Sequence, residues 1–362
     1  MRLIIGLLLL ISIQNARSVE LNSAELKSPE INYELVYQLK ASIVKVHVAT
    51  KSGGHGVGTG VVVGKDLVAT NCHVVANALG VKITKFGDSF TPDAMRADWK
   101  HDVCVMRFQY LGMKPVELGD SENLKYEQNI FSIGFPGGSP KPITTPGKIK
   151  ALYALDSSEV VRTDASFVMG ASGSPVFDSD GKLIALSTVK SPGHSAYFYN
   201  VPVKWIKALL DSPQLGKPEV AVLETQSLKT DVSPFWDAPE EQRPFFMRVV
   251  LSYQNAKWDD LEKVAALWVS KEPKSEEAHF YLGVARENLG NTDAAKNAFF
   301  EALKLHPQHA ATLQELGLMA NKAGNQPELS RLKVAMQEAG GDVLEEFNER
   351  INPTPEPAIE SQ

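Results

Sequence analysis

The stretch Met169-Gly170-Ala171-Ser172-Gly173-Ser174-Pro175-Val176 places one serine inside a glycine-rich turn. Small residues flank Ser172 on both sides, and an apolar, strand-like run begins at Pro175. A nucleophilic serine needs this setting, because its Oγ must project without neighbouring bulk and the N–H groups of the turn must converge on a developing oxyanion. Turns of this composition are common in β proteins, so Ser172 predicts catalysis only if partners occur elsewhere in the chain.

Two candidate partners lie upstream of the serine. His73 follows an apolar, strand-like pattern over residues 60–69, and Asp102 opens a second such pattern over residues 102–106. A serine hydroxyl needs a neutral imidazole to take its proton, and that imidazole needs a carboxylate to fix its tautomer. Asp98 is a rival carboxylate. We prefer Asp102 because the alternation after it places it on a defined strand face, whereas Asp98 lies in a more polar run.

Several motifs occur in a fixed order along this region, and the order His73, Asp102, Ser172 is that of the chymotrypsin triad. The motifs are Gly58-Thr59-Gly60-Val61-Val62-Val63, Thr70-Asn71-Cys72-His73-Val74-Val75, Leu118-Gly119-Asp120-Ser121-Glu122, Ile133-Gly134-Phe135-Pro136-Gly137-Gly138, Thr163-Asp164-Ala165 and Leu183-Ile184-Ala185-Leu186-Ser187. From about residue 43 to residue 203 the chain resembles the trypsin-like serine peptidases, and among them the bacterial Deg/HtrA type. The resemblance implies a chymotrypsin-like double β-barrel that hydrolyses peptide bonds.

The resemblance also implies a role for each site residue. Ser172 attacks the scissile carbonyl, His73 serves as general base and then as general acid, and Asp102 orients His73. The N–H groups of Gly170 and Ser172 form the oxyanion hole. Because His73 must be neutral to act, we expect activity to fall as the pH drops through about 6–7.

The specificity pocket follows from the same resemblance. Ser166, with Phe167 beside it, would form the base of the pocket, and the opposite wall would come from Ser187, Thr188 and Val189. No acidic residue occurs among these five, so we expect a small or medium apolar side chain at the P1 position of the substrate, and not Lys or Arg.

Activation should not resemble that of the digestive relatives. Those enzymes place an aspartate just before the nucleophile and pair it with a newly cut N-terminus, whereas this chain has Ala171 at that position. We therefore expect no zymogen cleavage of that kind.

The two cysteines flank the expected His–Asp contact. If Asp102 contacts His73, then Cys72 and Cys104 come near the Cα separation of about 4.4–6.8 Å that a disulfide needs. The sequence therefore leaves two possibilities for Cys72 and Cys104, a disulfide or two buried free thiols. A zinc site made of these cysteines with His73 and His101 is disfavoured, because adjacent residues on a strand or turn point apart. We expect no metal and no cofactor.

The first residues have the pattern of an export signal. Met1-Arg2 precedes an apolar run over residues 3–13, and Ala16-Arg17-Ser18 supplies a small-x-small cleavage site, so residues 1–18 are predicted to be removed after Ser18. The apolar run is too short to span a bilayer comfortably, which predicts a secreted or periplasmic protein. The net charge of −6 and the lack of a basic cluster argue against a nucleic-acid partner.

A repeat marks a second domain. Leu282-Gly283 recurs as Leu316-Gly317, and Gly290-Asn291 as Gly324-Asn325, each after 34 residues, which is the tetratricopeptide period. We therefore predict a multidomain β plus α chain, with a protease domain over residues 30–210, a linker over 211–244, tetratricopeptide-like helical repeats over 245–342 and a disordered tail over 343–362. Such repeats would bind the protein substrate or a protein partner.

Two other functions remain open. The first is a catalytically silent scaffold with a protease fold that acts through its repeats; the presence of all three triad side chains argues against it. The second is an esterase or other acyl transferase, which would use the same serine on a different acyl donor.

Overall fold

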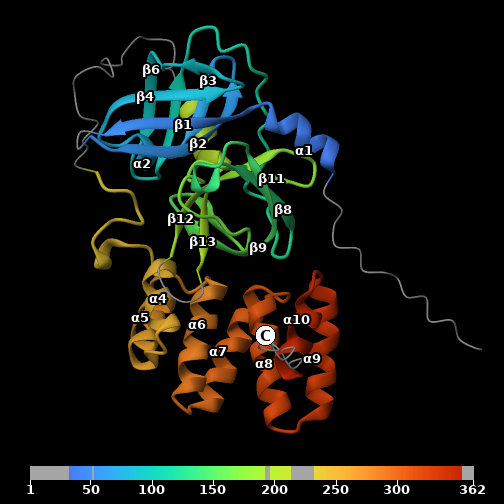
Figure 1. Ribbon diagram of the computed structural model, residues 1–362. Coiled ribbons are helices and arrows are strands. Elements are labelled where there is room, and N and C mark those ends of the chain that lie inside the picture. Colours follow the sequence, from blue (N-terminus) through green and yellow to red (C-terminus); the bar gives the residue numbers. More distant parts are fainter. Residues whose placement is uncertain (1–31, 51–52, 192–195, 213–231, 353–362) are drawn as a thin grey trace, which may run out of the picture. The chain divides into compact units, whose positions relative to one another are not determined.

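The computed structural model describes residues 32–50, 53–191, 196–212 and 232–352, so the predicted signal peptide lies outside the described residues. Two antiparallel β-sheets are followed along the chain by a set of helices (Figure 1). In the part of the chain that the structure describes, no helix is both long and apolar enough to cross a membrane.

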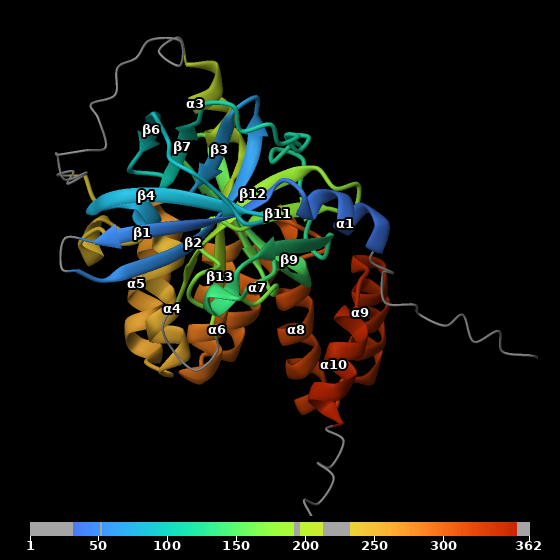
Figure 2. The same ribbon diagram turned by 45° about the horizontal axis from the view of Figure 1, so that its top comes forward.

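The first sheet has seven strands in the order β5-β4-β1-β2-β3-β7-β6. Figure 2 shows β1 running between β2 and β4. Valine-rich runs form its centre, and consecutive residues of β2 are buried because the strand is covered on both faces. The bounds are α1 Tyr33–Lys40, β1 Ile43–Thr50, β2 His55–Gly64, β3 Leu67–Thr70, α2 Cys72–Val75, β4 Ala78–Lys85, β5 Asp88–Phe90, β6 Ala94–Asp98 and β7 Val103–Arg107.

The second sheet closes into a barrel in the order β10-β13-β12-β11-β8-β9. Together the two sheets give the β-barrel-like pair that the sequence predicts, although the strand pairing closes only in the second. The bounds are β8 Asn129–Gly134, a short 3₁₀ turn at Pro136–Gly138, β9 Ile143–Leu155, β10 Ser158–Thr163, β11 Pro175–Asp178, β12 Leu183–Lys190, β13 Phe198–Pro202 and α3 Val203–Asp211.

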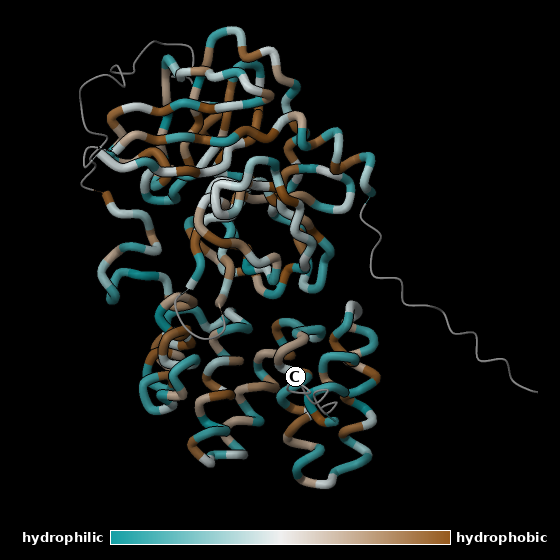
Figure 3. Tube along the Cα trace, in the orientation of Figure 1, coloured by the Kyte–Doolittle hydropathy of each residue, from teal (hydrophilic) through white to brown (hydrophobic). Residues whose placement is uncertain are grey.

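Seven helices follow in the described residues after a short 3₁₀ turn at Glu240–Gln242. Their bounds are α4 Phe245–Gln254, α5 Trp258–Lys271, α6 Glu276–Asn288, α7 Thr292–Leu305, α8 Ala310–Lys322, α9 Gln326–Ala339 and α10 Val343–Ile351. Helices α5, α7 and α9 begin at Trp258, Thr292 and Gln326, so each starts 34 residues after the one before. Hydrophobic and hydrophilic residues alternate along them, as expected for helices with one buried face (Figure 3).

Packing explains the repeated Leu-Gly pair. A Cβ on Gly283 would lie 2.5 Å from the ring of Phe299, and a Cβ on Gly317 would lie 2.7 Å from Met336 and 2.8 Å from Phe347. Glycine therefore lets neighbouring helices approach closely at the same point of successive helix pairs.

The predicted disorder from residue 343 is wrong for residues 343–351. These residues form α10, in which Val343 and Phe347 are completely buried. Val343, Phe347 and Ile351 recur every four residues and so share one helix face. The Pro- and Glu-rich composition of the tail favours disorder, but this apolar face packs and forms a helix.

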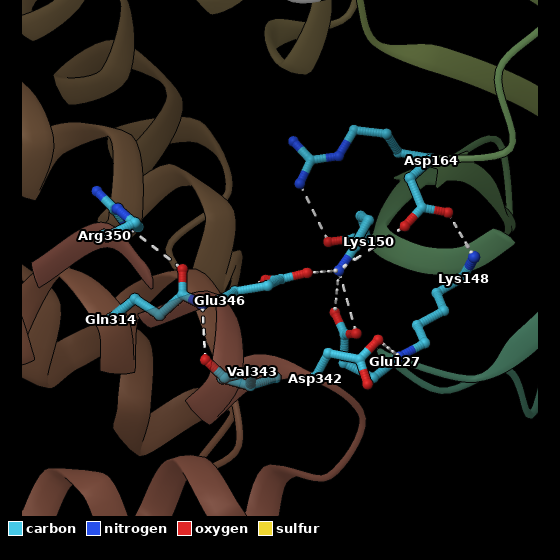
Figure 4. Close-up of polar contacts among 10 residues, drawn as sticks. Glu127, Lys148, Lys150, Asp164, Gln314, Asp342, Val343, Glu346 and Arg350 are labelled. Atoms are coloured by element: carbon cyan, nitrogen blue, oxygen red, sulfur yellow. Dashed lines mark hydrogen bonds and ion pairs between the residues drawn. The ribbon is translucent and has the colours of Figure 1, made fainter. Parts of the chain in front are cut away.

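Ion pairs join α10 to strand β9 of the barrel (Figure 4). The Nζ atom of Lys150 lies 3.0 Å from Glu127 and 3.1 Å from Glu346 of α10, and Lys148 pairs with Asp342. Burial raises the pKa of Glu127, and the nearby Lys150 opposes this rise. Because the Glu127 side chain is only 5% exposed, Lys150 neutralises a charge that would otherwise be costly to bury.

Replacing Phe347 by alanine tests the packing of α10. We expect Phe347→Ala to lower the free energy of unfolding by about 3–5 kcal/mol, because the substitution opens a cavity under a completely buried ring. Urea denaturation followed by circular dichroism measures the loss. The control is Val334→Ala on α9, where the side chain is 58% exposed and a change within about 0.5 kcal/mol is expected. Equal losses in the two variants would contradict the buried position of Phe347.

Candidate active site

His73 and Asp102 form a close pair between helix α2 and the start of strand β7. The Nδ1 atom of His73 lies 2.6 Å from Oδ2 of Asp102, and the backbone N–H of His73 donates to Oδ1 at 2.8 Å. The Asp102 side chain is 1% exposed and the His73 side chain 28%. With Nδ1 occupied by a carboxylate, the ring carries its proton there and leaves Nε2 as the acceptor for an incoming proton.

The rival carboxylate, Asp98, belongs to a different histidine. Asp98 accepts hydrogen bonds from the backbone N–H and the Nδ1 of His101, and Nε2 of His101 lies 2.9 Å from Asp156. Burial lowers the pKa of His101, but the hydrogen bonds to the two carboxylates outweigh burial and raise it. Asp98 is therefore engaged away from His73.

The Ser172 turn packs directly against the first sheet. The Ser172 carbonyl accepts a hydrogen bond from the Thr59 N–H at 2.9 Å. Gly173 has φ +83°, and a Cβ there would lie 2.5 Å from Thr70 Oγ1 and 3.3 Å from the Asn71 nitrogen. The turn thus lies against the residues that lead into His73. In the described chain no hydrogen bond joins the Ser172 hydroxyl to His73, and such bonds commonly tighten only when substrate binds.

Two N–H groups of this turn are available to a ligand. Those of Gly170 and Ser172 donate to no acceptor within the described ranges, whereas the N–H of Ala171 donates to Val168 and that of Gly173 to Ser187. Gly170 has φ +90°, and a Cβ there would lie 2.7 Å from the Phe135 carbonyl oxygen. An oxyanion hole needs preorganised donors of this kind.

A buried hydrogen-bond chain connects the two sheets beside the His–Asp pair. The Asn71 side-chain amide donates to the Asp102 carbonyl and to Thr188 Oγ1, both at 3.0 Å, and the Thr188 hydroxyl donates to the Leu186 carbonyl at 2.8 Å. Asn71 is completely buried. This chain holds Asp102 and strand β12 at a fixed separation.

The five predicted pocket residues differ in exposure. Ser187 and Thr188 are almost completely buried, Ser166 is exposed, and Phe167 and Val189 are half-buried. The ring of Phe167 packs 5.0 Å from that of Phe198. The side chains of Ser166, Phe167 and Val189 are therefore the accessible ones.

Trp236 is a site residue that the sequence pattern does not predict. Its Nε1 donates to Asp102 Oδ2 at 3.0 Å, and its ring lies edge-on to the His73 ring with centroids 5.4 Å apart. Trp236 lies in the segment predicted as a linker, which has no periodic pattern. The only available signal was the aromatic pair Phe235-Trp236 within a Pro-rich, charged stretch.

A disulfide joins Cys72 of α2 to Cys104 of β7, with Cα atoms 4.9 Å apart. It links the helix that carries His73 to the strand that follows Asp102. Within the described ranges, no group of three or more His, Cys, Asp or Glu side chains has a metal-binding arrangement.

Removing this disulfide should destabilise the protein. The bond closes a loop with a sequence separation of 32 residues, for which chain entropy predicts a loss of about 3–4 kcal/mol in the double variant Cys72→Ser/Cys104→Ser. Urea denaturation of the oxidised wild type and the variant measures this difference. Reduced wild type is the matched control and should unfold close to the variant. A difference below about 1 kcal/mol between oxidised and reduced wild type would contradict a stabilising bond.

Known proteins resemble the region that holds these residues. Residues 58–186 match the trypsin-like peptidase domain family. A probable periplasmic serine endoprotease DegP-like of Halomonas elongata is 30% identical over 156 residues, which cover 41% of this chain and 33% of the relative. The chloroplastic Protease Do-like 1 of Arabidopsis thaliana is 33% identical over 159 residues, covering 40% of this chain and 36% of that protein.

Solved structures also align with part of the chain. A protease from M. tuberculosis in its active form aligns with a TM-score of 0.47 and 22% identity, covering 53% of this chain and 87% of that one. The chain spans about a third of the length of the curated relatives it matches. The matched region includes His73, Asp102 and Ser172, and it is therefore similar to trypsin-like serine peptidases of the Deg/HtrA type.

Proposed function

We propose that this protein is a serine endopeptidase that acts through Ser172, His73 and Asp102. The observation that carries the proposal is the 2.6 Å contact between His73 and the buried Asp102, beside a turn with two unused N–H groups. His73 Nε2 takes the proton of the Ser172 hydroxyl as its oxygen attacks the peptide carbonyl, and the imidazolium then protonates the leaving amine. Water repeats the sequence on the acyl-enzyme and frees Ser172.

The N–H groups of Gly170 and Ser172 would stabilise the tetrahedral intermediates. They belong to a turn fixed by backbone contacts, so they need little reorganisation when the oxyanion forms. Losing one such donor typically costs about 2.7–4 kcal/mol in the transition state.

The proposed pocket favours an apolar substrate residue. Phe167 and Phe198 offer apolar surface beside Ser166, and Lys190 places a positive charge 5.9 Å from the centre of the Phe198 ring. A cation in this position repels a Lys or Arg side chain at P1.

We further propose that the protein is exported. The predicted signal peptide supports this, and relatives named as periplasmic agree with it. The Cys72–Cys104 disulfide fits a compartment that permits such bonds.

The helical region is proposed to form tetratricopeptide-like repeats that bind the protein substrate or a partner. The 34-residue spacing of α5, α7 and α9 supports the repeat. Part of its surface already contacts the barrel, because the Tyr126 hydroxyl donates to Glu276 at 3.2 Å and to Glu277 at 3.3 Å. A partner would therefore bind to the remaining surface of the helices.

Labelling with a fluorophosphonate probe tests the proposed nucleophile. The wild type should be labelled covalently, and Ser172→Ala and His73→Ala should each abolish labelling, because one variant lacks the attacking oxygen and the other the base. Ser174→Ala is the matched control, since this serine is two residues away and buried, and labelling should persist. Unlabelled, folded wild type would instead favour a catalytically silent scaffold.

Cleavage of a peptide library tests the pocket and separates a peptidase from an esterase. We expect hydrolysis mainly after small or medium apolar residues, with Lys and Arg at P1 cleaved at least about tenfold less efficiently because Lys190 repels them. A profile dominated by Lys or Arg contradicts this pocket. Hydrolysis of ester substrates without any peptide cleavage contradicts the endopeptidase.

A further inference from the structure

The buried carboxylate of Asp102 receives one of its hydrogen bonds from outside the two sheets. Oδ1 accepts from the backbone N–H of His73, whereas Oδ2 accepts from His73 Nδ1 and also from the indole N–H of Trp236. The nearby hydroxyl of Thr188 donates to the Leu186 carbonyl instead. Trp236 is therefore the one side chain besides His73 that donates to this carboxylate within the described residues.

The segment that carries Trp236 is held in place through its neighbour Phe235. The Phe235 N–H donates to the carbonyl of Lys100, two residues before Asp102, at 2.9 Å. The Phe235 ring is 5% exposed and packs 6.5 Å from Trp205 of α3 and 6.4 Å from Phe246 of α4. Its neighbour Trp236 is thus held between the loop that ends in Asp102 and the first helix of the helical region.

Helix α4 is itself anchored to the barrel. Phe246 stacks on Tyr153 of β9 with ring centroids 4.5 Å apart and lies 5.6 Å from Tyr199 of β13. A continuous set of buried contacts therefore leads from barrel strands β9 and β13, through α4 and Phe235, to the indole on Asp102.

We propose that Trp236 is a positioning residue of the active site. Through it, the start of the helical region orients Asp102 and limits how strongly Asp102 stabilises the protonated His73 ring. The inference rests on the proposed serine endopeptidase. The indole N–H fixes the rotation of the carboxylate and shares Oδ2 with the imidazole. A carboxylate oxygen that already accepts one hydrogen bond is a weaker partner for a second donor, so Trp236 limits how strongly Asp102 stabilises the imidazolium.

The direction of the effect follows from the charges around the carboxylate. His73 of α2 is the titratable group that is hydrogen-bonded to Asp102. His101, on the turn before Asp102, is bonded to Asp98 and Asp156 instead. Lys100 of the same turn pairs with Asp156, and the connecting segment contributes the uncharged indole. Loss of the indole N–H concentrates negative charge on Oδ2 and so favours the protonated form of the His73 imidazole.

The test compares full-length wild type with Trp236→Phe, which keeps an aromatic ring and removes the N–H donor. NMR titration of the His73 ring gives its protonation midpoint without requiring turnover, and peptide hydrolysis gives kcat and KM. We expect the midpoint to rise by about 0.5–1 pH unit, which is about a three- to tenfold change in proton affinity. We expect kcat to fall about tenfold at the pH plateau, with KM changed less than about twofold.

Trp205→Phe is the matched control, because this buried tryptophan lies in the same aromatic cluster and stacks on His101 without a hydrogen bond to Asp102. It should leave the midpoint and kcat unchanged. An unmoved or lowered midpoint in Trp236→Phe overturns the proposal, as does an equal rise in Trp205→Phe. The two proposals can fail separately. If the midpoint rises in Trp236→Phe but the wild type is not labelled by fluorophosphonate, Trp236 still positions Asp102 and His73, and the proposed endopeptidase is rejected.

Discussion

The burial of the Asp102 carboxylate is the constraint on which the site depends. An ionised group that is 1% exposed is strongly destabilising unless its oxygens are hydrogen-bonded and its charge has a partner. Here three donors meet it, two from His73 and one from Trp236. Asp102 adopts φ +60°, an uncommon conformation for a residue with a side chain, at the point where the chain turns into β7. The hydrogen bonds and the Cys72–Cys104 link hold that turn in place.

The second constraint is the contact between the two sheets. Glycines at this contact let the two backbones approach each other closely. A Cβ at Gly58 of β2 would lie 3.3 Å from the carbonyl oxygen of Ser172 in the turn before β11. On the other side of the contact, a Cβ at Gly173 would press on the backbone of β2. The backbone of the Ser172 turn therefore packs directly on the backbone of β2. The turn cannot move away from the His73 helix without breaking several contacts. The position of the nucleophile results from this close approach more than from any side chain of its own.

These features explain what the sequence could and could not predict. Ser172 and His73 each lie in a short motif whose residue types are needed locally, so sequence alone singles them out. The 34-residue spacing is also visible in the sequence, because Gly283 and Gly317 recur where neighbouring helices pack closely. Trp236 contacts Asp102 from a position 134 residues later in the sequence, and no local pattern encodes such a long-range contact. Helix α10 was not predicted for a different reason. Its polar composition favours disorder, but three apolar residues on one face stabilise the helix because α8 and α9 cover that face.

The contact between the helices and the barrel bears on how the helical region can act. Glu277 of α6 is 2% exposed, and its carboxylate contacts His309, the residue before α8, and Tyr126, which lies just before β8, both at 3.3 Å. Burial raises the pKa of Glu277, but the hydrogen bonds from His309 and Tyr126 and the charge of Arg162 outweigh it and lower the pKa. Separating the helices from the barrel would break this network. A ligand bound to the helices would therefore act on a region that is already joined to the barrel, in which Phe246 of α4 packs on Phe235, the neighbour of Trp236.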